Sequence, residues 1–196
     1  MNSCVPKVFG SMTPPQLELM VAGRWLAGPM PLRQWYSSAK QPPGQRTLGT
    51  WSAFNAATTA SAAQLRASLA VLPELAEAGL VGAGKDISMA GTCGSLAMLL
   101  ETSGVGAVLE LERIPAPPEV EPLRWLTAFP SFGYVLAVDD GAVRQVCARF
   151  DAVGVACAPV GHVTESAQLA LRHAGEQTSY LDLAERPLTG FGGFDQ

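Results

Sequence analysis

The polar residues best placed for chemistry lie in one short stretch, residues 86–94, which reads DISMAGTCG. A helix that begins near Thr92 would present free backbone N–H groups and the positive end of its dipole, which together favour an anion such as phosphate. Gly91 and Gly94 would let a ligand approach the backbone. Ser88 and Thr92 would donate hydrogen bonds from their hydroxyls. The stretch therefore predicts an anion site.

A carboxylate opens the same stretch and leaves a second interpretation open. Asp86 can accept a hydrogen bond from a ligand hydroxyl, an amine or a metal-bound water. In the structural alternative, Asp86 and Thr92 only cap the helix, and the glycines only allow a tight turn. The glycine spacing fits neither a P-loop nor a dinucleotide-binding fingerprint. Sequence alone does not choose between these interpretations.

The composition indicates a globular protein with an interaction surface. The 196 residues suffice for one domain with a good core, or for one domain plus a loose arm. Apolar residues make up 48% and charged residues only 15%, which hints at an oligomeric or inter-domain surface. A net charge of −4 and no basic run argue against nucleic acid as a partner.

Targeting signals and cysteine spacing bear on the compartment. No apolar run reaches the roughly 18–20 residues that span a bilayer, and residues 1–12 show no secretory signal pattern. The four cysteines form no CxxC pair and no zinc-like spacing. Cys93, Cys147 and Cys157 have apolar neighbours, so we expect buried thiols in a reducing cytoplasm, with no membrane partner.

The two histidines add little to the candidate site. His173 ends a predicted strand, and we expect it at the surface. His162 follows Gly161 at a strand junction, where it either lines a pocket or serves no chemical role. The chain has no GxSxG elbow and no histidine-rich metal cluster. We therefore predict no metal site and identify no catalytic residue.

The pattern of the chain predicts one folded domain after an N-terminal arm. Seven of the fifteen prolines fall in residues 1–50, which we expect to form a poorly defined arm, although 16–26 could be a helix or strand. Residues 51–191 form the domain, and 192–196 a loose tail. The domain is predicted to be α+β, a layered mixed sheet covered by helices.

The expected elements alternate along residues 51–191. Ser61 is a plausible N-cap, Leu65, Leu69 and Leu72 form an apolar stripe, and Gly104 ends the second main helix. Asp139 or Asp140 caps a later helix, and Gly161 forms a turn or bulge. The expected helices are 61–72, 74–78, 92–103, 121–128 and 140–150; the expected strands are 86–88, 105–111, 134–138, 155–160, 168–172 and 178–183.

Three separated segments resemble one known family. They are KDISMAGTCGSLAMLLETSGVGAVLEL at 85–111, FPSFGYVLAV at 129–138 and GVACAPVGHVT at 154–164. In this order they resemble the C-terminal domain of the aminoimidazole ribonucleotide (AIR) synthetase superfamily, which includes selenophosphate synthetase, thiamine monophosphate kinase and a hydrogenase maturation protein. The resemblance extends from about residue 51 to about residue 191.

The resemblance implies ATP-dependent chemistry with ATP and Mg²⁺, in which phosphate activates an acceptor atom of the substrate. In full-length members an N-terminal domain binds ATP and magnesium and forms the dimer, and nothing in residues 1–50 matches that domain. Met89 stands where many members carry an acid. The residues implied to bind substrate or phosphate are Asp86, Ser88, Gly91, Thr92, Gly94, Ser131 and Gly133.

Three functions stay open at this point. The first, which we favour, is the substrate- and phosphate-binding half of a kinase- or ligase-like enzyme, completed by a separate ATP-binding domain. The second is a self-sufficient ATP-dependent transferase that works as a homo-oligomer. The third is a non-catalytic remnant whose apolar surface mediates interaction. The sequence does not identify the substrate, the acceptor or the partner.

Overall fold

The structure is a computed structural model, and it describes residues 17–23, 35–37, 52–54, 60–117, 120–130 and 132–191. Seven strands form one mixed sheet in the order β10-β9-β5-β8-β1-β7-β4. Only β5 and β9 run parallel, and every other neighbouring pair in this sheet is antiparallel. The strands are β1 (Leu17–Gly23), β4 (Val81–Asp86), β5 (Gly106–Glu110), β7 (Gly133–Asp139), β8 (Ala156–Thr164), β9 (Gln168–His173) and β10 (Glu176–Asp182).

Strand β1 lies inside this sheet, between β7 and β8. Leu19, Met20 and Val21 are each at most 1% exposed, so both faces of the strand are covered. Burial of such a side chain contributes about 2 kcal/mol. The expectation of a loose arm is therefore corrected for residues 17–23, which belong to the core of the domain. The rest of 1–50, apart from 35–37, and the predicted tail 192–196 lie outside the described residues.

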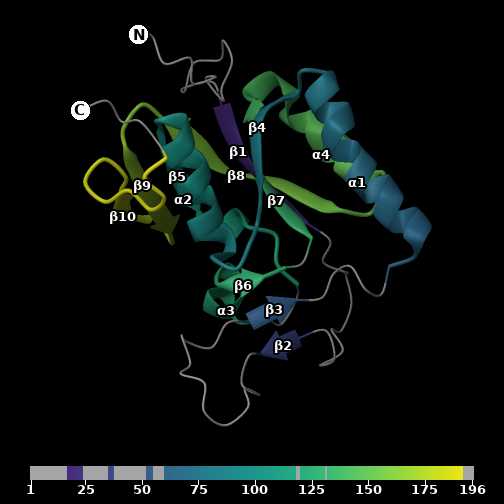
Figure 1. Cartoon of the computed structure of the whole chain (residues 1–196), viewed down its shortest axis with the longest axis horizontal. Helices are drawn as coiled ribbons and strands as arrows, with labels where there is room; N and C mark the ends of the chain where they lie inside the picture. The colour runs from purple at the N-terminus through teal and green to yellow at the C-terminus, as the bar shows by residue number, and fades with distance from the viewer. Residues whose placement is uncertain are drawn as a thin grey trace.

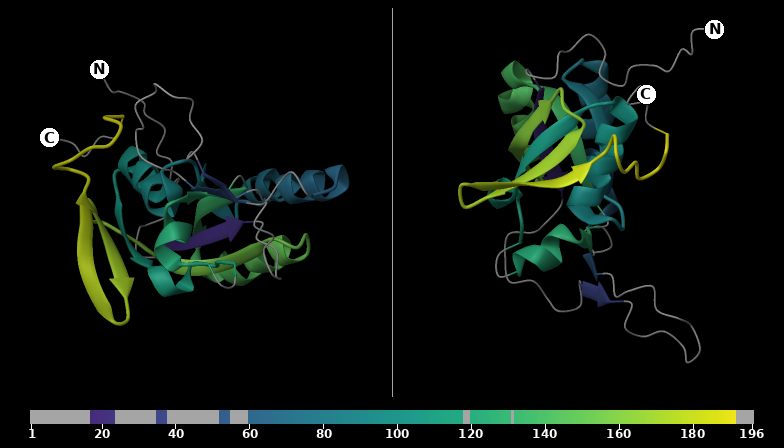
Figure 2. Two further views of the ribbon diagram at one scale, coloured as in Figure 1. Left: turned by 90° about the horizontal axis from the view of Figure 1, so that it is seen from below. Right: turned by 90° about the vertical axis from the view of Figure 1, so that its left-hand side faces the viewer.

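Helices cover both faces of the sheet. Helix α2 (Gly91–Ser103) packs against β4, β5 and β7, whereas α4 (Val143–Asp151) packs against β8. Figure 1 shows the arrangement, and Figure 2 shows α2 and α4 on opposite sides of the sheet. The short α3 (Pro122–Leu126) contacts α2, and α1 (Ala62–Glu77) contacts α4 and β4. The predicted α+β class, a mixed sheet covered by helices, is confirmed.

Helix α1 differs from its prediction in length and in its buried side. Ser61 is the N-cap, as expected, and it forms a capping box with Gln64. Pro73 lies inside one continuous helix rather than in the first turn of a second. Leu69 is 50% exposed, while the buried positions are Ser68, Val71 and Leu75. The predicted stripe was therefore wrong at Leu69, whereas Leu65 is half-buried and Leu72 packs, partly buried, against the core.

Several other boundaries were predicted correctly. Gly104 ends α2 in a left-handed conformation, and β8 is irregular next to Gly161, where its register with β1 shifts. Strands β9 and β10 form the expected hairpin. The predicted strand 86–88 was misplaced, because β4 ends at Asp86. Asp139 caps the 3-10 turn η4 (Asp140–Ala142), and the N-cap of α4 itself is Ala142.

A second, smaller sheet lies beside α3. It contains β2 (Trp35–Ser37), β3 (Ser52–Phe54) and β6 (Ala128–Phe129), with β2 and β3 antiparallel and β3 and β6 parallel. The 3-10 turn η3 (Leu111–Arg113) follows β5 and contacts β8 and β9. The backbone of residues 52–54 is thus connected to the segment that precedes β7.

The C-terminal end of α2 carries a buried carboxylate. Glu101 is 0% exposed and accepts hydrogen bonds from the backbone N–H groups of Leu188, Thr189 and Gly190, at 2.7–3.1 Å. Burial alone would raise the pKa of Glu101, but these hydrogen bonds outweigh it and hold the pKa below the ordinary 4.5. The carboxylate therefore fastens the segment after β10 to α2.

We predict that this carboxylate makes stability fall in acid. A group whose pKa is lower in the folded state stabilises above its unfolded pKa, near 4.5, and the contribution is lost as the pH falls through the folded value. Glu101→Gln replaces an acceptor by a donor that faces backbone N–H groups, so it should cost about 2 kcal/mol at neutral pH. Urea unfolding at a series of pH values measures both effects.

The matched control is Glu165→Gln, since Glu165 is exposed. That variant should retain the wild-type stability at neutral pH and the wild-type loss in acid. Equal stabilities of the Glu101 and Glu165 variants at neutral pH would contradict the proposed fastening role.

Candidate functional site

The turn before α2 folds back on the helix through backbone contacts. The N–H of Ser88 donates to the Ser95 hydroxyl oxygen at 2.9 Å, and the N–H of Gly91 donates to the Ser88 carbonyl at 3.0 Å. Ser95 is 0% exposed, so its hydroxyl anchors the turn from inside the domain. Sequence reasoning missed Ser95, because a serine in the first turn of a helix carries no sign of its partner.

No side chain caps this helix N-terminus. The N-cap residue is Ala90, which makes no side-chain cap hydrogen bond. Thr92 is 4% exposed, and its hydroxyl makes no hydrogen bond to any residue of the described part of the chain. The first turn of a helix has N–H groups without intrahelical acceptors. The capping role that the structural alternative gave to Asp86 and Thr92 is therefore not realised.

Asp86 stands at the end of edge strand β4 and points away from the core. Its carboxylate is 64% exposed and pairs with Lys85 Nζ at 3.0 Å. Opposite it in the sheet lies Tyr134, whose pKa is raised by burial and then by the negative charge of Asp86. Phe132 packs edge-on against Tyr134, with ring centroids 5.4 Å apart. Lys85 and Tyr134 are further polar neighbours that sequence reasoning missed.

The loop before β7 lies next to this turn, as the resemblance implied. The N–H of Ile87 donates to the Gly133 carbonyl at 2.8 Å. The structure thus brings Gly133 beside the stretch that contains Asp86 and Ser88. Ser131, the other predicted member from this loop, lies outside the described residues.

The two glycines of the turn lie in close contact with other atoms of the same chain. Gly91 has φ +67°, and a Cβ there would collide with the backbone carbonyl oxygen of Leu126 and lie 2.9 Å from Thr127 Cα. At Gly94 a Cβ would meet Ala90 at 2.5 Å. Gly91 therefore allows α2 to begin against the end of α3. Close packing explains this glycine without a ligand.

The remaining polar residues lie away from the turn. His173 is exposed, as predicted, with Nδ1 3.6 Å from Glu112 Oε1. His162 on β8 lies opposite Glu18 on β1. Burial raises the pKa of Glu18, and Asp140 raises it further, against the opposing effects of His162 and Arg113. This cluster was missed because its central carboxylate belongs to the segment that sequence analysis placed outside the domain.

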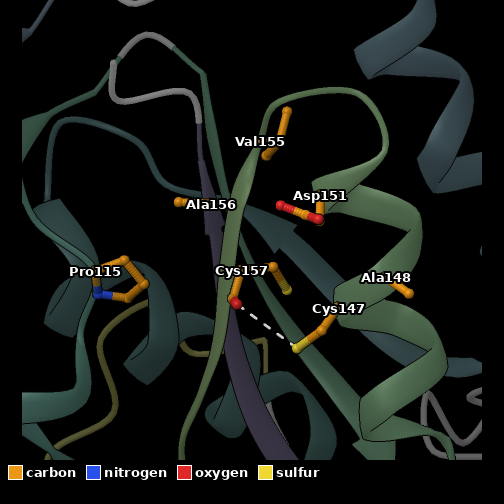
Figure 3. A pocket seen from close by; sticks show the side chains of 7 residues that line it. All are labelled: Pro115, Cys147, Ala148, Asp151, Val155, Ala156 and Cys157. Atoms are coloured by element: carbon orange, nitrogen blue, oxygen red, sulfur yellow. Dashed lines mark hydrogen bonds between the residues drawn. The ribbon is translucent and has the colours of Figure 1, made fainter. Parts of the chain in front are cut away.

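Two hollows flank α4, and neither includes a residue of 86–94. The first, of about 500 Å³, is lined by Pro115, Cys147, Ala148, Asp151, Val155, Ala156 and Cys157 (Figure 3). The second is open and lies along the start of α4, from Asp140 to Ala148. Cys93, Cys147 and Cys157, which were expected to be buried, are free thiols that pack against the core but are only partly buried. Cys4 lies outside the described residues.

Two properties concern the described part of the chain as a whole. Within it, no three His, Cys, Asp or Glu side chains are grouped so that they could hold a metal ion. None of its helices is long and apolar enough to cross a membrane.

The fold of this chain is similar to parts of several solved structures. *T. maritima* PurL complexed with ATP matches 88% of this chain and 25% of its own, with 14% identity and a TM-score of 0.63. PurL complexed with FGAR matches 88% of this chain and 28% of its own, with 14% identity and a TM-score of 0.64. *E. coli* HypE matches 58% of this chain and 38% of its own, with 19% identity and a TM-score of 0.50. These likenesses show a shared fold.

Sequence comparison defines the family. Residues 43–174 match the AIR synthase related protein, C-terminal domain, and the chain belongs to that family. The *Synechocystis* protein sll0787 is 40% identical over 140 residues, which are 71% of this chain and 44% of that protein. The *Methanocaldococcus jannaschii* protein MJ0640 is 29% identical over 137 residues, 70% of this chain and 42% of that protein. The chain thus spans less than half the length of these curated relatives.

We predict that Gly91→Ala destabilises the fold by about 3 kcal/mol, because the added methyl must displace backbone and occupy a left-handed conformation. Gly79→Ala is the matched control. Gly79 has the same φ of +67°, but a Cβ there would meet nothing within 4 Å. It should cost only about 1 kcal/mol. Urea unfolding of the two variants checks the difference, and equal losses would mean that packing against α3 does not matter.

Proposed function

We propose that this chain supplies the substrate- and phosphate-side wall of an ATP-dependent, kinase- or ligase-like enzyme, with the N-terminus of α2 as the phosphate site. The observation that carries the proposal is the uncapped start of α2 beside the buried Thr92 hydroxyl. A buried hydroxyl without a partner costs about 1–3 kcal/mol, and a phosphate oxygen that accepts its hydrogen bond would remove that cost. Unshared N–H groups and the helix dipole favour the same anion.

The residues of the turn divide into two roles in this proposal. Thr92 and the free N–H groups of the first turn would hold the phosphate, while Ser95 and Gly91 fix the backbone that presents them. Asp86 is exposed and would accept a hydrogen bond from a substrate hydroxyl or amine. The backbone N–H and carbonyl of Ser88 both form hydrogen bonds within the turn, so only its hydroxyl is available to a ligand. Gly133, the first residue of β7, lies beside the turn and accepts a hydrogen bond from the Ile87 N–H.

The residues of this wall provide only some of the groups that ATP and Mg²⁺ need. The described residues offer donors for phosphate, but Asp86 is the single carboxylate among the turn residues 86–94, and Mg²⁺ is usually held by one or two carboxylates together with phosphates. We therefore propose that a separate ATP-binding domain, or a second chain, contributes the metal-binding acids and completes the cleft. Family membership supports this, as do solved PurL complexes with ATP and with FGAR, which share the fold.

Titration of the ¹⁵N-labelled chain with inorganic phosphate tests the site directly. We expect the amide signals of Thr92, Cys93 and Gly94 to shift together with one dissociation constant. Thr92→Val keeps the shape but removes the hydroxyl, so it should weaken phosphate binding about tenfold, equivalent to 1.4 kcal/mol. Thr92→Ser should bind as the wild type does.

Thr102→Val is the matched control at the other end of α2, where the hydroxyl donates to backbone carbonyls of its own helix. It should leave phosphate binding unchanged. Shifts confined to other residues, or equal affinity of the Thr92→Val variant and the wild type, would overturn the assignment. Repeating the titration with ATP and Mg²⁺ separates a site for phosphate from a site for the whole nucleotide.

A further inference from the structure

The groove beside α4 contains two cysteine side chains from different elements. Cys147 lies on α4 and Cys157 on β8, and the Cys147 Sγ is 3.6 Å from the Cys157 backbone oxygen. Figure 3 shows both cysteines lining this groove, with a dashed line from the Cys147 sulfur to the Cys157 backbone oxygen. Both residues are only partly buried, so small molecules can reach the pair. The groove is separate from the turn at 86–94.

The groove around the thiols explains their accessibility. Val155 and the first two residues of β8, Ala156 and Cys157, line one side of it, and α4 and Pro115 line the others. Cys157 is only half-buried although β8 is an internal strand of the sheet. A thiol pair at such an opening differs from a cysteine that merely fills a core.

We propose that Cys147 and Cys157 are a redox-active dithiol that closes to a reversible disulfide across this groove, with peroxides as the oxidant. The Cys147 thiol gives up its proton, and its sulfur attacks one oxygen of hydrogen peroxide. The O–O bond breaks, the departing hydroxide takes up that proton to become water, and Cys147 is left as a sulfenic acid. The Cys157 sulfur then attacks that sulfur, its proton joins the departing hydroxide, and a second water is released. One peroxide and two thiols thus give one disulfide and two waters.

The surroundings assign the order of the two cysteines. Burial raises the pKa of Cys157, and the neighbouring Cys147 raises it further through its charge and a hydrogen bond between the two side chains. We therefore propose Cys157 as the resolving thiol, because its burial disfavours the thiolate form. A metal is a poorer interpretation, since no third His, Cys, Asp or Glu among the described residues completes a ligand group.

The disulfide would tie α4 to the sheet at the groove. Cys147 and Cys157 are close in sequence, so the crosslink closes a short loop and should raise the unfolding temperature by about 5 °C. The proposed consequence is an α4 that is covalently tied to β8 in the oxidised protein and held against it by side-chain packing alone in the reduced protein. This inference does not depend on the phosphate site.

The test is oxidation of the purified full chain with one equivalent of hydrogen peroxide. We expect two of the four thiols to be lost, a non-reduced digest to contain a Cys147–Cys157 linked peptide, and dithiothreitol to restore both thiols. Cys157→Ser should leave a sulfenic acid at Cys147 that dimedone captures. Cys93→Ser is the matched control and should form the linked peptide as the wild type does.

Wild-type protein alone can decide the matter if a serine variant fails to fold. Oxidation of the folded chain should give the Cys147–Cys157 peptide selectively, whereas oxidation in urea should also give pairs that include Cys93. An unfolding temperature that rises on oxidation and falls again with dithiothreitol would support the crosslink. Absence of the linked peptide, crosslinks only between chains, or sulfinic acid at Cys147 in the wild type would overturn the proposal.

Discussion

Strand β1 is the one element through which the two parts of the sheet meet. On one side it pairs with β7, which pairs with edge strand β4, and on the other side it pairs with β8, which leads to β5, β9 and β10. Its backbone groups satisfy both neighbours, and its buried side chains contact the layers on both faces. Without it, β7 and β8 would each have an unpaired edge in the interior, which is costly for buried backbone groups.

This position also determines where the candidate site lies. Strand β7 holds β4 in register, and β4 delivers Asp86 to the turn before α2. The Gly133 carbonyl, at the start of β7, anchors Ile87 on the same turn. The site at α2 therefore depends on a strand that is far from it in sequence and that contributes no side chain to it.

The two ends of α2 differ in their hydrogen-bond partners. At the C-terminal end, Glu101 fastens the segment at residues 188–190, and every partner comes from this chain. At the N-terminal end, the Gly91 N–H donates to the Ser88 carbonyl, but no side chain caps the helix and the Thr92 hydroxyl has no hydrogen-bond partner among the described residues. One end of α2 is thus fastened by contacts within the chain, while the other has no side-chain cap. The groove beside α4 is a third region, lined by the free thiols Cys147 and Cys157.

Local features of the chain were determined by the sequence itself. The capping box at Ser61, the end of α2 at Gly104 and the irregularity near Gly161 follow from residue type and spacing, because caps and glycine turns need only near neighbours. The family was predicted from three separated segments that occur in the order expected for it, and the α+β class from the order of the predicted helices and strands. Of the candidate site, Asp86, Ser88 and Thr92 were predicted from one stretch, and the structure brings Gly133 beside that stretch through the Ile87 N–H.

Long-range partners were decided only by the tertiary structure. Nothing near Leu17–Gly23 in sequence reveals that it pairs with β7 and β8, so prolines around it suggested an arm. Leu69 was predicted to be buried, but helix α1 places that side in solvent. Gly91 is required by the backbone of Leu126, and Cys147 meets Cys157 only because α4 packs on β8. Periodicity and caps describe a segment, whereas register, close approach and thiol pairing depend on which segments the core brings together.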